Sequence, residues 1–280
     1  MPYVQRAGQP TLHYRVDDFT DPWSSAGTIV LQHGYARSSR FWHGWVPHLA
    51  RFYKVVRPDL RGHGESPVNF NPATESTLAG YVGDVLAVLD ELGLDSVHYC
   101  GESFGGVIGM MLAAEHPHRV RTLSIISSPV YQNEKSQTAY AAGFPTREDA
   151  LRTLGTKRWA EVIYGAPDFF PEGTDPKLRW WYVNEIGKSD AEVLCGLNGL
   201  LRHANVQDCL PRIRAPVLSL YPTAGMLTSS EQELLLAAGI RSLRLIHLPT
   251  QSHAVLTLFP AECAEHVLNF VAQNDADAAA

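Results

Sequence analysis

Short apolar runs alternate with amphipathic segments along most of this chain. Runs of aliphatic and β-branched residues predict buried strands, whereas apolar residues that recur every three or four positions predict helices that face a core. Strands are expected at residues 3–6, 11–16, 28–32, 55–58, 96–100, 121–126, 215–221 and 242–248. Helices are expected at residues 41–51, 77–92, 107–116, 229–238 and 260–272. Because strands that alternate with helices form parallel sheets, the pattern predicts an α/β fold with a mostly parallel eight-stranded sheet flanked by helices.

The alternation stops between residues 130 and 206. No strand-like run occurs there, and helices are expected instead at residues 147–154, 157–164, 178–186 and 191–201. Such an insertion predicts a helical cap, residues 130–206, over one end of the sheet. Residues 1–129 and 207–280 then form the α/β core, and residues 275–280 are expected to be a frayed tail.

Composition and charge narrow the class of partner. The chain has 280 residues, of which 45% are hydrophobic and 19% charged, and its formal net charge is −6. The sequence is mildly acidic and has no basic cluster of the kind that binds nucleic acid or an anionic membrane. The expected partner is therefore a small-molecule substrate. The first residues lack the build of a signal peptide, and no apolar run approaches the roughly 20 residues that span a bilayer. The expected location is the cytoplasm.

The four cysteines do not indicate a metal site or a disulfide framework. They are scattered through the sequence, without a C-x-x-C pair and without the His/Cys spacing of a zinc site. We therefore expect free thiols, and we expect chemistry that needs neither a cofactor nor a metal. The cysteines are Cys100, Cys195, Cys209 and Cys263.

The candidate nucleophile is Ser103, at the centre of a G-x-S-x-G motif formed by residues 101–105. A predicted strand precedes the motif and a predicted helix follows it, the context in which such a serine sits at a strained turn with its hydroxyl exposed. Gly101 and Gly105 supply the small neighbours that a tight turn needs. The helix N-terminus directs unpaired N–H groups at the same point, so the backbone N–H of Phe104 is expected to stabilise an oxyanion.

Four motifs in this order resemble those of the α/β-hydrolase fold, and the resemblance covers nearly the whole chain. They are His33-Gly34 after the third strand, residues 59–66 (DLRGHGES) after the fourth, residues 101–105 after the fifth, and His253 after the eighth. Within this fold the chain is most similar to the capped esterases, enol-lactonases and ring-fission carbon–carbon hydrolases.

The resemblance implies that Ser103 is the nucleophile, and that the backbone N–H groups of Tyr35 and Phe104 form the oxyanion hole. It also implies that His253 is the general base and then the general acid. The position of His253 supports this independently, because a base must lie in a loop at the same sheet edge as the serine. Most of the other eleven histidines fall within predicted strands or beside predicted helices, and His247 is the second candidate.

The third member of a catalytic triad is missing from its usual position. The family usually places an aspartate at the end of the seventh strand, but this chain has Gly225 there, in the sequence Pro-Thr-Ala-Gly. The alternative site after the sixth strand holds Ser127-Ser128-Pro129 and offers no carboxylate either. A triad carboxylate fixes the histidine tautomer and stabilises the imidazolium, and its loss costs roughly 10⁴ in rate in a serine protease.

Three explanations of this gap remain open. A relocated acid is the first, with Glu231, Glu233 or Glu134 reaching the histidine from the start of a helix or from the cap. A Ser–His dyad is the second, and a protein that binds its ligand but barely turns it over is the third. Of the other acids near the motifs, Glu102 is expected to point away from the nucleophile, and Asp59 to hold its glycine-rich loop.

Aromatic residues predict a largely apolar pocket closed by the cap, although each by itself is more typical of core packing. Two arginines near the predicted oxyanion loop, Arg37 and Arg40, have the chemistry to pair with a substrate carboxylate, but both are expected to be exposed to solvent. The aromatic residues are Phe41, Trp42, Trp45, Trp180, Trp181 and Tyr182.

The expected function is that of a serine hydrolase of the carboxylesterase or lactonase type. Such an enzyme attacks a small ester, thioester or lactone and passes through an acyl-enzyme. One alternative is the hydrolysis of a carbon–carbon bond in a ring-fission product. The other is a small-molecule-binding homologue with little turnover.

Overall fold

An eight-stranded sheet forms the centre of the molecule in the computed structural model, which describes residues 2–166, 169–225 and 227–279. The strands are β1 Tyr3–Val4, β2 Leu12–Asp17, β3 Thr28–Gln32, β4 Lys54–Pro58, β5 Val97–Glu102, β6 Val120–Ile126, β7 Val217–Pro222 and β8 Leu243–Leu248. In space they follow the order β1-β2-β4-β3-β5-β6-β7-β8. β2 runs antiparallel to β1 and β4, and all other pairs are parallel. The mostly parallel eight-stranded sheet predicted from the sequence is confirmed.

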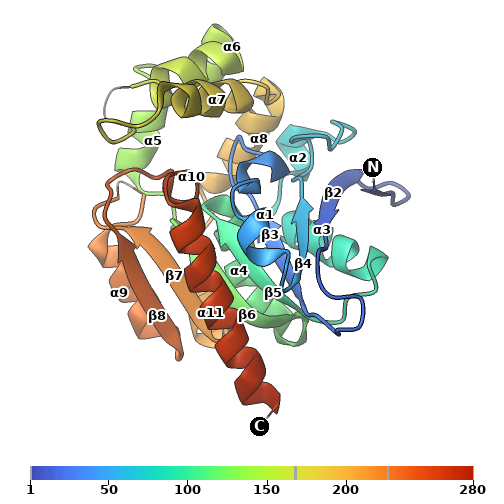
Figure 1. Ribbon diagram of the computed structural model, residues 1–280. Helices are drawn as coiled ribbons and strands as arrows, with labels where there is room; N and C mark the ends of the chain where they lie inside the picture. The colour runs from blue at the N-terminus through green and yellow to red at the C-terminus, as the bar shows by residue number, and fades with distance from the viewer. Residues whose placement is uncertain (1, 167–168, 226, 280) are drawn as a thin grey trace.

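Helices cover both faces of this sheet (Figure 1). Those outside the predicted cap are α1 Val46–Leu49, α2 Pro72–Glu75, α3 Leu78–Glu91, α4 Phe104–Glu115, α9 Ser230–Gly239, α10 Val255–Leu258 and α11 Pro260–Ala279. Short 3₁₀ helices occur at Ser39–Trp42, Pro117–Arg119 and Gln207–Arg212. α3 and α4 pack together behind the sheet in Figure 1, while α1 and α11 pack together in front of it. Apolar strand residues between these layers, such as Val30, Val56, Ile125 and Leu220, are fully buried.

Between β6 and β7 the described residues form four α-helices, which lie beyond the carboxyl ends of the strands (Figure 1). They are α5 Glu134–Tyr140, α6 Arg147–Tyr164, α7 Pro176–Ile186 and α8 Ala191–Leu201. α6 packs against both α7 and α8. Gly155 has a φ of 74°, which interrupts the helical backbone of α6 and explains why the sequence predicts two separate helices there.

The helix predicted over residues 41–51 is wrong. The chain instead forms the 3₁₀ helix Ser39–Trp42 and, after a break, the short helix α1. Gly44 lies in the break, and a Cβ atom added there would come within 3.0 Å of the Pro260 side chain. Pro47 lies in the first turn of α1 and has no N–H to donate, so a continuous helix over residues 41–51 is interrupted there although the periodicity is helical.

The frayed tail predicted for residues 275–280 is also wrong as far as the structure describes it. α11 continues to Ala279, and residue 280 lies outside the described residues. Asp275 anchors this last part of the helix: its carboxylate lies 2.6 Å from Arg121 Nη2 and accepts a hydrogen bond from the Tyr53 hydroxyl at 2.9 Å. Tertiary ion pairing thus orders a segment that is locally polar.

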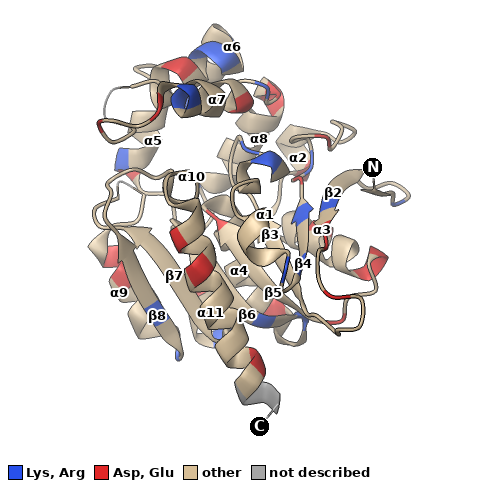
Figure 2. Cartoon of the chain, in the orientation of Figure 1, with Lys and Arg blue, Asp and Glu red and all other residues tan. Residues whose placement is uncertain are grey.

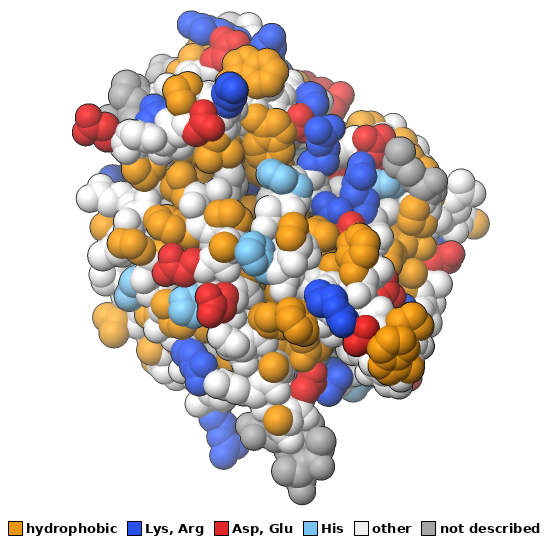
Figure 3. All heavy atoms as spheres, viewed as in Figure 1, with side chains coloured by type: hydrophobic (Ala, Val, Ile, Leu, Met, Phe, Trp, Pro, Cys, Tyr) orange, Lys and Arg blue, Asp and Glu red, His pale blue; other side chains and the backbone are white. Residues whose placement is uncertain are grey.

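Charges of both signs are interspersed over the chain (Figure 2), and basic, acidic and apolar side chains alternate on the face drawn in Figure 3. Within the described part of the chain, no helix combines the length and apolar character needed to cross a membrane. The same residues include no cluster of three or more His, Cys, Asp or Glu side chains that would hold a metal ion. All four cysteines are free thiols.

Candidate active site

Ser103 occupies a strained turn between β5 and α4. Its φ of 53° and ψ of −119° are unfavourable for a residue with a side chain, and such strain is typical of functional positions. The turn has no room for larger neighbours, because a Cβ atom at Gly101 would lie 2.3 Å from the carbonyl oxygen of Gly105. A Cβ atom at Gly105 would in turn lie 2.3 Å from the carbonyl oxygen of Gln32. The glycines of the motif are therefore required by the backbone that presents the serine.

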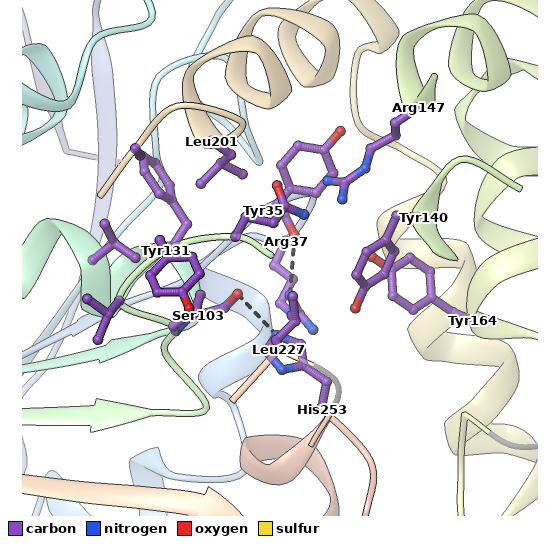
Figure 4. Close-up of a pocket in the computed structure, with 16 residues that line it drawn as sticks. Tyr35, Arg37, Ser103, Tyr131, Tyr140, Arg147, Tyr164, Leu201, Leu227 and His253 are labelled. Carbon is purple, nitrogen blue, oxygen red and sulfur yellow. Dashed lines mark hydrogen bonds between the residues drawn. The ribbon is translucent and has the colours of Figure 1, made fainter. Parts of the chain in front are cut away.

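His253 meets this serine from the loop between β8 and α10. Its Nε2 atom lies 3.1 Å from Ser103 Oγ, and both residues line the same pocket (Figure 4). Burial, with a smaller contribution from the nearby guanidinium of Arg37, lowers the pKa of His253 to about 3. The imidazole is consequently neutral near pH 7, the form in which it can accept a proton.

The loop after β3 packs directly on the serine. A Cβ atom at Gly34 would lie 2.8 Å from Ser103 Cβ, so this glycine allows the two backbones to approach closely. Tyr35 follows it and lines the pocket, as does Phe104, the first residue of α4. The first N–H groups of a helix have no partner within that helix, so the backbone N–H of Phe104 is available to a ligand. The two residues predicted to form an oxyanion hole thus flank Ser103.

Buried polar contacts hold this loop in place. His33 Nδ1–H donates to the carbonyl oxygen of Gly34 at 2.9 Å, and its Nε2 accepts the backbone N–H of Leu60 at 2.9 Å. Asp59 accepts the backbone N–H of Ser39 at 2.6 Å and pairs with His13 Nδ1 at 2.7 Å. The structural role predicted for Asp59 is confirmed.

No acid occupies the usual triad position. Gly225 lies just after β7, where a Cβ atom would come within 2.5 Å of Thr228 Oγ1. Among the described residues, the one carboxylate that lies next to the His253 ring is that of Glu102, whose Oε1 atom is 3.6 Å from Nε2. It therefore approaches the nitrogen that faces Ser103, rather than the opposite nitrogen that a triad aspartate would contact.

The three glutamates considered as relocated acids have other surroundings. Glu233 lies 3.2 Å from Nε2 of His247, the second candidate base, so these two residues pair with each other on α9 and β8. Glu231 lies beside Tyr131, where it helps burial to raise the pKa of the tyrosine hydroxyl. Glu134 is exposed in the first turn of α5. The structure brings none of them together with His253.

Two expectations about this region are wrong. Glu102 does not point away from the site: it is fully buried and its Oε2 atom accepts the backbone N–H of Gly34 at 3.1 Å. Arg37 is not exposed to solvent but is 3% exposed, with Nη1 3.4 Å from Glu102 Oε1. The left-handed backbone of Ala36, with a φ of 59°, turns the chain at this point. Arg40 is exposed, as expected.

Arg37 and Glu102 form a buried ion pair beside the histidine. The guanidinium also donates to the Tyr35 carbonyl oxygen at 3.3 Å and to the Tyr182 hydroxyl. Burial by itself lowers the pKa of Arg37, but Glu102 and neighbouring tyrosine hydroxyls outweigh that effect, so the net shift is upward and the group stays charged. Burial raises the pKa of Glu102, while Arg37 and the Gly34 N–H limit the rise.

The pocket above Ser103 is lined largely by aromatic and aliphatic side chains, which come from loops at the sheet edge and from the helices α4, α5, α6 and α8. Most of the aromatic residues singled out in the sequence have other roles: Trp42 and Trp45 are buried in the core, and Trp180 is 68% exposed. Sequence reasoning named Tyr35 only for its backbone N–H, and it missed Tyr131, Tyr140, Tyr164 and Arg147. The residues labelled in Figure 4 are Tyr35, Arg37, Ser103, Tyr131, Tyr140, Arg147, Tyr164, Leu201, Leu227 and His253.

A parallel sheet with a strained serine after its fifth strand and a histidine after its last strand defines an α/β hydrolase. The chain belongs to this family: residues 27–176 match the family model described as alpha/beta hydrolase fold.

The proteins to which this chain is similar include some that are named as hydrolases and one that is named as a receptor. The chain is 29% identical over 259 residues to the pimeloyl-[acyl-carrier protein] methyl ester esterase of Aeromonas hydrophila, covering 87% of this chain and 94% of that protein. It is 37% identical over 200 residues to the karrikin insensitive 2 receptor CA of Petunia hybrida, covering 69% and 72% respectively. The crystal structure of the enol-lactonase from Burkholderia xenovorans LB400 superposes with a TM-score of 0.83, 25% identity and coverage of 97% and 100%. The fold and these esterase and lactonase relatives support a hydrolytic activity.

Proposed function

We propose that the protein is a serine hydrolase of the carboxylesterase or lactonase type, which acts on a small ester, thioester or lactone without a cofactor. The observation that carries this proposal is the 3.1 Å contact between His253 Nε2 and Ser103 Oγ at a strained turn. A serine hydroxyl is a weak nucleophile, and a neutral imidazole within hydrogen-bonding distance is what activates it. The apolar pocket favours a small organic substrate as the partner.

In the proposed reaction, Ser103 Oγ attacks the substrate carbonyl while its proton passes to His253 Nε2. The negative charge that develops on the carbonyl oxygen is stabilised by the backbone N–H groups of Tyr35 and Phe104. The protonated histidine then gives its proton to the leaving oxygen or sulfur, which departs and leaves an acyl-enzyme. A water molecule attacks the acyl-enzyme in the same way and regenerates the serine.

Glu102 has a distinct part in this scheme. Its carboxylate lies 3.6 Å from His253 Nε2, so it attracts the positive charge that forms on the ring during proton transfer. It offsets the repulsion from Arg37, which would otherwise oppose that charge. The site is thus proposed to operate as a Ser–His dyad with a buried carboxylate on the Nε2 side.

A second candidate function is that of a small-molecule receptor with slow turnover. Two observations favour it: the glycine at the usual acid position, and the 37% identity to a petunia protein named as a receptor. In this role the same pocket would bind its ligand, and the serine would react slowly or not at all.

Intact-mass spectrometry after exposure to a fluorophosphonate probe tests the proposal, with p-nitrophenyl ester hydrolysis measured alongside. We expect the wild type to gain one adduct and to hydrolyse short esters. Ser103→Ala should form no adduct. Its kcat/KM should be lower than that of the wild type by roughly 10³-fold or more. Ser24→Ala, which changes an exposed serine away from the pocket, is the matched control and should behave as the wild type. Saturable binding of a small molecule, without an adduct and without turnover, would reject the hydrolase proposal and favour the receptor function.

A further inference from the structure

Arg147 is a buried cation within the pocket. It belongs to the first turn of α6, is 4% exposed, and lines the same cavity as Ser103 and His253. Its guanidinium lies 4.9 Å from the ring centre of Tyr35 and 4.6 Å from that of Tyr140. Figure 4 shows the side chain reaching from the cap toward Tyr35. Within the described residues, its Nε and Nη2 atoms have no hydrogen-bond partner.

The contacts with Tyr35 and Tyr140 compensate part of the cost of burying this cation, but they supply no opposite charge. A charged group that is removed from water needs an opposite charge and hydrogen bonds. A cation in the first turn of a helix also opposes the helix dipole. The acids close by are already paired: Glu148 lies 2.6 Å from Arg202, and Glu102 is paired with Arg37. No described aspartate or glutamate forms an ion pair with Arg147.

Other arginines of this protein show what the same edge of the guanidinium binds. In three of them Nε and Nη2 together hold both oxygens of one carboxylate, at distances of 2.6 to 3.0 Å. This two-pronged geometry is the strongest pairing that arginine makes with a planar anion. These pairs are Arg57 with Asp17, Arg61 with Asp84, and Arg152 with Glu192. Arg147 lines the substrate pocket, and the equivalent two atoms of its guanidinium have no hydrogen-bond partner among the described residues.

We propose that Arg147 binds a carboxylate group of the substrate through Nε and Nη2, while the carbonyl to be cleaved lies at Ser103. The stretch between them would pass Tyr140, Leu201 or Leu227, so it should be apolar. The substrate class is therefore a carboxylate-bearing ester, thioester or lactone with an apolar spacer. The position of the carbonyl rests on the proposed function, whereas the anion subsite itself does not require turnover.

Calorimetric titration with glutarate, adipate and suberate tests the subsite without any reaction. At least one of these dicarboxylates should bind the wild type, and Arg147→Met should weaken that binding by about 10- to 100-fold. Arg147→Lys keeps the charge but loses the two-pronged geometry, so it should restore part of the affinity. Arg152→Met makes the same substitution at an exposed position on the same helix and should bind as the wild type.

Matched substrate pairs test the same inference in turnover and show which side of the ester carries the charge. On the acyl side, p-nitrophenyl half-esters of the three dicarboxylic acids are compared with p-nitrophenyl alkanoates of equal length. On the alcohol side, 4-carboxyphenyl butyrate is compared with phenyl butyrate. In one of these two arms the wild type should prefer the charged member, and Arg147→Met should lower that preference by about 10- to 100-fold, mainly through KM.

Thermal unfolding separates an anion subsite from a structural arginine. Replacing an uncompensated buried charge by methionine should raise the Tm of the protein measured in buffer alone, whereas removing a structural arginine would lower it. Failure of all three dicarboxylates to bind, or binding and charge preference that do not change in Arg147→Met, would overturn the subsite. Dicarboxylate binding that depends on Arg147 without hydrolysis of any ester would retain the subsite and reject the serine hydrolase. Ester hydrolysis together with dicarboxylate binding that does not depend on Arg147 would retain the serine hydrolase and reject the subsite.

Discussion

Two turns at the carboxyl edge of the sheet, where an α/β hydrolase keeps its nucleophile and its acid, are built differently here. The turn after β5 holds Ser103 in a strained backbone, with glycines at the two positions where any side chain would collide with the chain. The turn after β7 has Gly225 where the family usually has an aspartate, and the space beside it is taken by the hydroxyl of Thr228.

In this fold the serine turn and the acid position can therefore change independently. The nucleophile turn is locked by backbone contacts, so it cannot change without moving β3 and β5. The acid position is a side chain on a turn, and packing can replace it without disturbing the sheet. Glu102 then supplies the one described carboxylate beside His253, on the side of the ring that faces the serine. It can stabilise charge there, but it cannot fix the tautomer through the other nitrogen.

The largest effect is expected from removing the base. His253→Ala should lower kcat/KM for p-nitrophenyl butyrate by roughly 10³-fold or more, because the serine loses the group that accepts its proton. His247→Ala is the matched control, since that histidine pairs with Glu233 away from the pocket, and it should stay within about twofold of the wild type. Equal losses in the two variants would show that His253 is not the base.

A restored acid should produce the next largest change. The double variant Gly225→Asp with Thr228→Ala places a carboxylate at the usual position and removes the nearer of two atoms that a Cβ atom there would meet; Pro222 Cγ, at 2.9 Å, must shift slightly. We expect kcat to rise by roughly 10-fold or more, because the carboxylate stabilises the imidazolium and fixes its tautomer. Thr228→Ala alone is the control for the loss of the hydroxyl. An unchanged kcat in the double variant would mean that the dyad does not lack an acid at this position.

Loss of the buried carboxylate should be smaller in rate but visible in stability. Glu102→Gln leaves Arg37 buried without its counter-charge, which is expected to lower the free energy of unfolding by about 3–5 kcal/mol. It also leaves the charge on His253 unbalanced, so kcat should fall by roughly 10-fold. Urea unfolding and ester hydrolysis measure the two effects. Wild-type stability in this variant would show that the ion pair is not required by the fold.

The activity should not change with pH in the range where a free histidine would titrate. Burial and Arg37 both disfavour the imidazolium, so the pKa of His253 is lowered to about 3 and its base form persists well below pH 6.5. We expect kcat/KM for the uncharged p-nitrophenyl butyrate to vary by no more than about twofold between pH 8 and pH 5. An acidic limb centred near pH 6.5 would contradict the lowered pKa.

The smallest effects are expected from substitutions of the three glutamates that the sequence analysis considered as relocated acids. Glu134→Gln, Glu231→Gln and Glu233→Gln should each leave kcat/KM within about twofold of the wild type, because the structure brings none of these carboxylates to His253. The same ester assay measures all three. A loss comparable to that of His253→Ala in any one of them would identify it as the acid.

Much of the fold follows from local patterns in the sequence. The central strands, which include Val30 and Ile125, are buried on both faces of the sheet. Their apolar runs are therefore continuous and easy to recognise. The two errors have different causes. Pro47, a local signal, interrupts the helix predicted over residues 41–51, whereas a distant ion pair between Asp275 and Arg121 orders the predicted tail.

The turn that carries Ser103 and the loop that carries His253 can be recognised from the residues alone. Both depend on short-range features, namely glycines at fixed spacing and the position of a loop after a strand. The charges around them depend instead on how the chain folds. Glu102 accepts the N–H of Gly34, which lies 68 positions away, and Arg147 reaches the pocket from α6. Burial and pairing of charge depend on which distant segments exclude water, and no local pattern of residues records that.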